Sequence, residues 1–90
     1  MGTFHDHLGE WHGVTIAMQT RDGTIYVGRC HEVNEHVVVM HDADHHHDGD
    51  GGMNTADYLK KAGRWGVFKK HDHLVLECAQ VAWIKPLNQF

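Results

Sequence analysis

The sequence predicts a mainly β fold, a small and strongly bent antiparallel barrel, and three observations within residues 13–42 support this. Residues 14–19 alternate apolar and polar side chains, which is the period of a half-buried strand. The pair Asp22-Gly23 follows and is typical of tight hairpins, because both turn positions favour positive φ. A second strand from Thr24 contains a lone glycine, Gly28, and residues 37–40 predict an almost wholly apolar third strand.

The length of 90 residues predicts one domain, residues 1–90, near the lower limit for a self-sufficient core. No apolar run approaches the ~18–20 residues that span a bilayer, so we expect no membrane segment. The first residues are rich in histidine and acids, which argues against a secretory signal. Cys30 and Cys78 lie within apolar strand patterns, which favours reduced thiols and a cytoplasmic location.

Charge is distributed unevenly along the chain. Residues 1–50 hold two bases and nine acids, whereas residues 51–90 hold six bases and three acids, and the net charge is −4. Nucleic-acid-binding domains are usually strongly basic, so this balance alone does not indicate one. The eleven histidines are unusual, and because histidine ordinarily gains a proton near pH ~6.5, the net charge should become positive in mild acid.

The first predicted element is a short N-terminal helix. Thr3 is a suitable N-cap, and Phe4, Leu8 and Trp11 recur at helical spacing. Gly13 can end this helix, whose apolar stripe would cover one open end of the barrel.

A long loop and a short helix are predicted after the third strand. Residues 42–52 are polar or glycine apart from one alanine, so we expect a loop that stays out of the core. A helical turn is expected from about Thr55 to Lys61, with Thr55 as its N-cap, an ion pair between Asp57 and Lys61, and Gly63 as its stop.

The remaining residues predict the end of the sheet. Residues 65–68 resume strand character, and residues 71–72 indicate a turn or a bulge. Two strands are then expected at residues 74–78 and 81–84. Pro86 should end the sheet, because proline cannot donate to a β-ladder.

The order of these elements and the residues within them resemble the Sm-like (LSm and Hfq) proteins. The spacing L-x-x-W-x-G-V-x-I-x-M-x-x-x-D-G-x-x-Y-x-G-x-C runs from Leu8 to Cys30, and the valine run at residues 37–39 follows it. Residues 74–87, which end in I-x-P-L, look like the second motif of that family. The resemblance implies a five-stranded SH3-type barrel after the N-terminal helix, with a variable insert at residues 44–64 between strands three and four.

The same resemblance implies a homo-oligomeric ring of about five to seven subunits that binds single-stranded RNA. Asn34, His36 and Gln80 stand nearest to the positions where the family contacts RNA. The family's Arg-Gly pair is missing from the turn between the last two strands, which reads Cys-Ala-Gln here. The segment before the third strand is also more acidic, with Glu32 and Glu35. These departures leave the fold prediction intact and weaken the prediction of an RNA site.

The residues after the third strand offer metal-ligand chemistry. The candidate ligands are Asp44, His45, His46, His47 and Asp48. Imidazole and carboxylate are natural ligands of Zn²⁺, Ni²⁺ or Cu²⁺. The competing interpretations are a solvated loop and the adventitious capture of a divalent metal, since adjacent histidines rarely point at one ion. We therefore expect no resident cofactor.

A second candidate surface is basic and aromatic. Its residues are Lys60, Lys61, Arg64, Trp65, Lys69 and Lys70. Single-strand nucleic-acid platforms use this combination, because the charges follow the phosphates and the rings stack on bases. The alternative interpretation places Trp65, Val67 and Phe68 in the core, with the lysines as a solvated flank.

Catalysis finds no support in the motifs. The chain has no serine, no G-x-S-x-G and no Walker loop, so we expect that it is not an enzyme. Two classes remain: a ring that binds single-stranded RNA, and a structural ring that docks protein partners, as phage or mobile-element rings do. Binding to an oligonucleotide that weakens steeply with salt would favour the first class.

Overall fold

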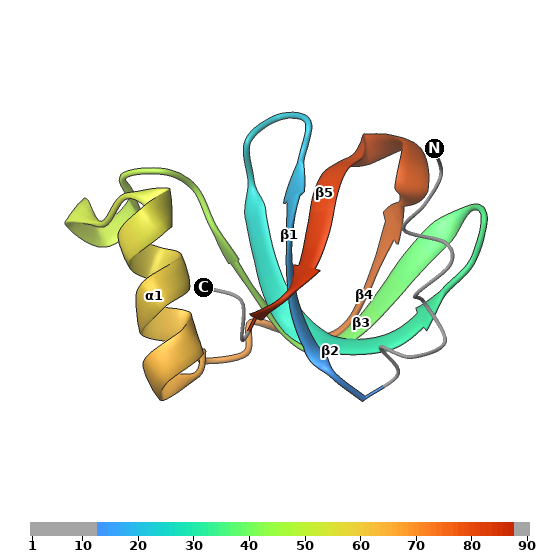
Figure 1. The fold of residues 1–90 in the computed structure, drawn as a ribbon, viewed down its shortest axis with the longest axis horizontal. Helices are drawn as coiled ribbons and strands as arrows, with labels where there is room; N and C mark the ends of the chain where they lie inside the picture. The colour runs from blue at the N-terminus through green and yellow to red at the C-terminus, as the bar shows by residue number, and fades with distance from the viewer. Residues whose placement is uncertain (1–12, 88–90) are drawn as a thin grey trace.

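The computed structural model describes residues 13–87 (Figure 1). The predicted N-terminal helix therefore lies outside the described residues. Five strands form a single antiparallel sheet in the order β4-β3-β2-β1-β5. The strands are β1 (Thr15–Thr20), β2 (Ile25–Val33), β3 (Val37–His46), β4 (His71–Glu77) and β5 (Val81–Pro86). One helix, α1 (Thr55–Trp65), and two 3₁₀ turns, η2 (Asp50–Gly52) and η3 (Cys78–Gln80), complete the described fold.

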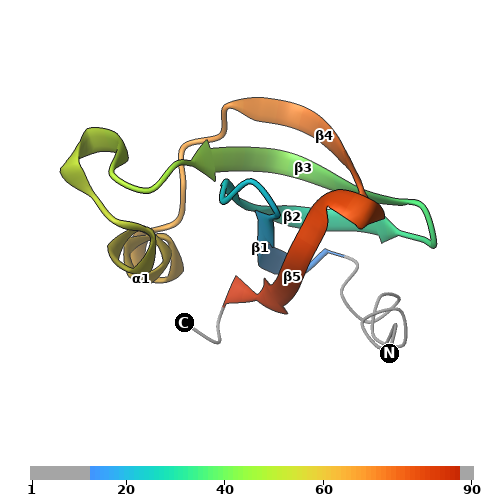
Figure 2. The same cartoon turned by 90° about the horizontal axis from the view of Figure 1, so that it is seen from above.

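The sheet is strongly bent, and α1 lies on the outer side of the bend (Figures 1 and 2). Gly28 lies on β2, where the register with β3 shifts. A Cβ atom at Gly28 would lie 2.8 Å from the Cβ of Ala43 and 2.9 Å from its Cα. The glycine therefore permits the close approach of the two strands that the bend requires, as the sequence predicts.

Two apolar clusters hold the chain together. The first lies inside the bent sheet and comprises Ile16, Met18, Cys30, Val38, Met40, Ala43, Val81 and Ile84. The second joins the sheet to the helix and comprises Ala17, Ile25, Val27, Tyr58, Leu59, Ala62 and Leu87. Alternate residues of β1 enter different clusters, because successive side chains of a strand point to opposite faces.

The prediction of a loop over residues 42–52 is wrong for its first half. β3 continues through His46, Ala43 is fully buried, and Asp44 and His46 are also buried. Partners from distant segments make this burial possible: Tyr58 and Lys70 bond to the Asp44 carboxylate. A buried carboxylate is tolerated when it is paired and hydrogen-bonded, and neither partner could be located from the local sequence.

The helix also differs from its prediction. It begins after Asn54, whose side chain accepts the Asp57 N–H, and it continues through Gly63 to Trp65. Gly66, at φ 78°, ends it, because glycine adopts a positive φ without strain. The predicted ion pair between Asp57 and Lys61 is not among the contacts of the described residues.

The segment that follows the helix is not a strand. Val67 and Phe68 lie in the connection to β4, and β4 begins at His71, where a turn or a bulge was expected. Pro86 is the last residue of β5, as predicted. Cys30 and Cys78 are free thiols. No helix in the described part of the chain is long and apolar enough to cross a bilayer.

Candidate functional site

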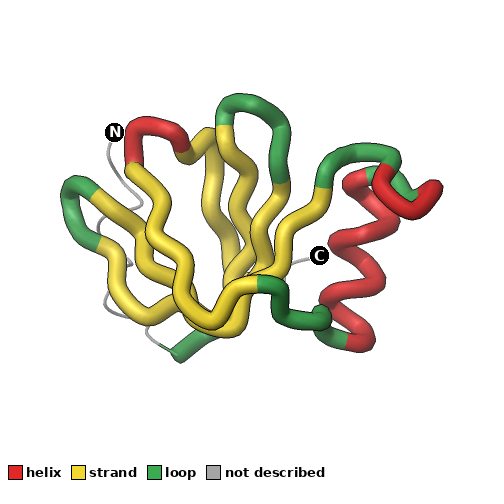
Figure 3. Tube along the Cα trace, turned by 180° about the vertical axis from the view of Figure 1, so that it is seen from behind, coloured by secondary structure: helices red, strands yellow, loops and turns green. Residues whose placement is uncertain are grey.

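The turn between β2 and β3 lies beside η3, at one end of the bent sheet (Figure 3). The Cys78 N–H donates to the His36 carbonyl oxygen over 2.8 Å, and the Cys78 thiol lies 3.3 Å from the Asn34 carbonyl oxygen. The fold thus brings together the two segments that carry the RNA-binding candidates.

Asn34 uses its side chain to shape the turn. Its Oδ1 accepts the N–H groups of His36 (2.8 Å) and Val37 (3.0 Å), and its Nδ2 donates to Glu32 Oε2 (3.0 Å). Such Asx bonds stabilise a turn locally. The sequence analysis proposed Asn34 as an RNA contact. In the structure, its side-chain amide already bonds to the backbone of the turn and to Glu32.

Gln80 lies on the other side of η3, against the β1–β2 turn. Its carbonyl oxygen accepts the Arg21 N–H (2.8 Å), and Arg21 Nε donates to the Ala79 carbonyl oxygen (2.8 Å). A hollow of about 280 Å³ lies between these residues, with Tyr26 also in its wall. Arg21 was missed by sequence reasoning, because nothing local places a residue of the first turn beside η3. Arg21 therefore places a guanidinium next to Ala79, in the turn between the last two strands. The residues of that turn, Cys78 to Gln80, include no arginine.

Asp22 gives this hollow an opposing charge. The Thr20 hydroxyl and the Thr24 N–H bond to its carboxylate and lower the pKa of Asp22. The carboxylate is therefore ionised at neutral pH, and it lines the same hollow as Arg21. The hollow presents both charges rather than a uniformly positive surface.

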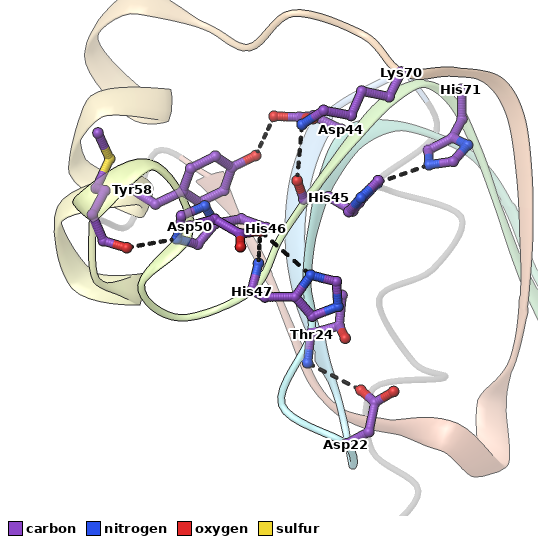
Figure 4. Close-up of polar contacts among 11 residues, drawn as sticks. Asp22, Thr24, Asp44, His45, His46, His47, Asp50, Tyr58, Lys70 and His71 are labelled. Carbon is purple, nitrogen blue, oxygen red and sulfur yellow. Dashed lines mark hydrogen bonds and ion pairs between the residues drawn. The ribbon is translucent and has the colours of Figure 1, made fainter.

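The end of β3 forms the polar junction with α1 that Figure 4 shows. Tyr58 Oη donates to Asp44 Oδ2 over 2.8 Å, and Lys70 Nζ donates to Asp44 Oδ1. Burial opposes ionisation of Asp44, yet the hydrogen bonds from Lys70 and Tyr58 outweigh it and hold the pKa of Asp44 below its ordinary value. Burial and the bond to Asp44 raise the pKa of Tyr58. The hydrogen bond between Tyr58 of α1 and Asp44 of β3 thus helps to hold the helix against the sheet.

The other predicted metal ligands point to different partners. His46 Nε2 lies 3.0 Å from the Met53 carbonyl oxygen, and its ring stacks on Tyr58 at 4.2 Å between centroids. His47 Nδ1 lies 3.4 Å from Asp50 Oδ2, and Asp48 accepts the Thr55 N–H. Among residues 13–87, no group of three or more His, Cys, Asp or Glu side chains is placed to hold a metal ion.

Histidines also line up across three neighbouring strands. His41 on β3 stacks on His31 of β2 at 4.2 Å between ring centroids, and it lies 5.2 Å from His73 of β4. Burial contributes most to lowering the pKa of His41, and charge on His31 or His73 lowers it further. Of the charged groups nearby, Asp42 opposes this shift and Arg29 adds to it.

This row of histidines predicts loss of stability in mild acid. Because the pKa of His41 is lowered in the native state, the unfolded chain binds the proton more readily, and stability falls as the pH drops below about 6.5. The pKa of His45 is lowered as well, by burial and by Lys70. The melting temperature should be lower at pH 5.5 than at pH 7.5, and His41→Gln should reduce that difference. An equal difference in the variant would contradict this role of His41.

The basic and aromatic candidate divides into two parts. Lys69 pairs with Asp72 (2.8 Å) and Asp42 (3.5 Å), and Lys70 pairs with Asp44, so the nearby acids neutralise both lysines. The other part lies on α1, where the candidate residues are Lys60, Lys61, Arg64 and Trp65.

The aromatic side chains beside α1 are outside the core. Trp65 is 75% exposed and Phe68 is 93% exposed, so the interpretation that placed them in the core is wrong. The reason is the position of the helix end: the buried face of α1 comprises Tyr58, Leu59 and Ala62, and Trp65 lies beyond it.

Comparison with solved structures identifies the fold. An Sm protein of Pyrococcus abyssii, solved in complex with a uridine heptamer, matches with a TM-score of 0.64 at 18% sequence identity. The match covers 91% of this chain and 94% of that chain. No protein-family model and no curated protein sequence matches the chain. The chain has the fold of an Sm protein.

Proposed function

We propose that this Sm-like chain forms a homo-oligomeric ring of about five to seven copies and binds single-stranded RNA. One observation carries the proposal: the chain shares its fold with an Sm protein that was solved with a uridine heptamer. In addition, its sheet ends in two edge strands, β4 and β5. Edge strands present unpaired backbone groups, and pairing β4 of one subunit with β5 of the next would satisfy both edges in a closed ring.

The hydrogen-bonding pattern of β4 supports edge pairing. The Cys78 N–H donates to the His36 carbonyl oxygen, and the same register continues along β4 and β3. Hydrogen-bonded and non-hydrogen-bonded pairs alternate along antiparallel strands. The N–H groups of His73, Val75 and Glu77 therefore point away from β3, and Val75 keeps an apolar side chain 49% exposed at this edge.

RNA would reach the end of the sheet where the β2–β3 turn lies beside η3. Arg21 offers a guanidinium there, and His36 and Gln80 offer side chains that can bond to bases. Glu32 and Glu35 raise the negative potential of the same turn, which opposes the approach of phosphate. We therefore propose a weak RNA contact at this end.

Replacing His36 and Gln80 together tests this contact. His36→Ala/Gln80→Ala should weaken binding of a uridine heptamer by about tenfold, the value of one or two net hydrogen bonds. Fluorescence anisotropy at fixed salt measures the affinity. Asp48→Asn, in the turn that follows β3, is the control and should bind as wild type does. Unchanged affinity in the double variant would place the RNA site elsewhere.

The acidic turn favours one alternative, a structural ring of the phage type that docks protein partners. A ring whose central turns carry glutamates repels phosphate and can accept a basic partner surface. In this alternative the ring assembles, and its affinity for oligonucleotides is negligible at physiological salt. We further propose a cytoplasmic, non-enzymatic role in either case.

A further inference from the structure

The exposed face of α1 concentrates positive charge. The helix buries Tyr58 and Leu59 against the sheet, which leaves Lys60, Lys61 and Arg64 toward solvent. Residues three or four apart on a helix are neighbours, so Lys60 lies near Arg64 and Lys61 lies near both Arg64 and Trp65.

Among residues 13–87, no acidic side chain pairs with these three cations. Lys60, Lys61 and Arg64 make no ion pair with any residue in the described range 13–87, whereas Lys69 and Lys70 are held by acids. The whole chain carries a net charge of −4, so this face differs in sign from the rest of the molecule. Such a face has electrostatic complementarity to an anion.

An exposed aromatic surface adjoins the cations. Trp65 and Phe68 lie largely in solvent at the end of α1. Trp65 lines a hollow of about 550 Å³ with Lys60, Lys61 and Arg64, and a second of about 430 Å³ with Phe68. Met53, Ala62 and Val67 give the second hollow an apolar wall. The Trp65 ring thus stands between a basic hollow and a hollow of mixed lining, in which Asp44 and Asp50 face the apolar wall.

The chemistry of this face matches a single strand better than a duplex. Unpaired bases stack on exposed aromatic rings, and the adjacent phosphates bind cations. A duplex keeps its bases stacked inside and offers phosphates only, so it would leave Trp65 and Phe68 without a partner. A binding face of this kind needs no base-specific hydrogen bonds and should tolerate different sequences.

We infer that Lys60, Lys61, Arg64, Trp65 and Phe68 form a binding face for single-stranded nucleic acid, separate from the turn that contains His36. The phosphates contact the three cations, and bases stack on Trp65 and Phe68. This face rests on the proposed function only in that RNA is the expected ligand. It requires no ring, because all five residues come from one chain.

Two variants on the face test the inference. Trp65→Ala should weaken binding of a fluorescein-labelled 12-nucleotide RNA by about 5-fold to 100-fold, since stacking stabilises each base by ~1–3 kcal/mol. Lys60→Gln/Lys61→Gln/Arg64→Gln should weaken binding and reduce the slope of log affinity against log salt by about 2. Lys69→Gln is the matched control, because Asp72 already neutralises that lysine, and it should change the slope little. All the replaced side chains are exposed, and thermal melting checks that each variant folds.

The outcomes separate this inference from the proposed function. If His36→Ala/Gln80→Ala loses affinity and the α1 variants keep it, the inference is wrong and the RNA function stands. If the α1 variants lose affinity and the turn variant keeps it, the inference stands and the turn contact is wrong. If the protein binds oligo-dT as tightly as oligo-U, the result supports a face that accepts either single-stranded DNA or RNA. Wild-type protein that binds polyglutamate but neither oligonucleotide would overturn the inference in favour of an acidic protein partner.

Discussion

Gly28→Val is expected to lower the free energy of unfolding by about 3 kcal/mol, the upper end of the usual cost of overpacking. A Cβ at this position would lie 2.8 Å from the Ala43 Cβ and 2.9 Å from the Ala43 Cα. One of these atoms belongs to the backbone of β3, so a side-chain rotation cannot relieve the clash. The two strands must separate, and the bend of the sheet opens.

Urea unfolding of the variant and of wild type measures this effect. Thr15→Val is the control, because Thr15 is an exposed strand residue and valine keeps its β-branched shape while replacing the hydroxyl with a methyl group. The control should unfold close to wild type. A Gly28→Val protein that unfolds within a few tenths of a kcal/mol of wild type would show that the strands do not approach closely at this point.

Val75→Pro is expected to abolish assembly while leaving the subunit folded. The Val75 N–H points away from β3, so proline removes a donor that only a neighbouring subunit would use. Proline is tolerated on edge strands for the same reason. The variant should elute as a monomer of 10.3 kDa in light scattering, with a circular dichroism spectrum like that of wild type.

Val75→Thr is the matched control for this prediction. Threonine keeps both the N–H and the β-branched shape, so the assembly should persist. If Val75→Pro assembles as wild type does, then β4 is not the interface, and the edge pairing proposed for the ring is wrong.

The features that the sequence predicted well are those encoded by neighbouring residues. The alternation in residues 14–19 and the Asp22-Gly23 turn predict β1 and the hairpin correctly. The lone glycine at Gly28 predicts the bend, and Pro86 predicts the end of β5. Each of these signals depends on a backbone preference that acts within a few residues.

The features that the sequence missed depend on distant partners. Asp44 looks like a loop residue until Lys70 and Tyr58 are placed beside it. Arg21 becomes part of the candidate site only when η3 packs against the β1–β2 turn. The sequence analysis predicted strand character at Trp65, because aromatic residues favour strands and Gly63 was expected to end the helix. In the structure, the helix continues through Gly63 to Trp65. For Asp44 and Arg21, tertiary packing overrides the local pattern.

Native mass spectrometry of the wild-type protein, with and without a uridine heptamer, tests the central claim most directly. We predict a single assembly of about five to seven times 10.3 kDa, which gains the mass of the bound oligonucleotide when RNA is added. A species of 10.3 kDa that takes up no oligonucleotide would contradict both the ring and its RNA-binding role.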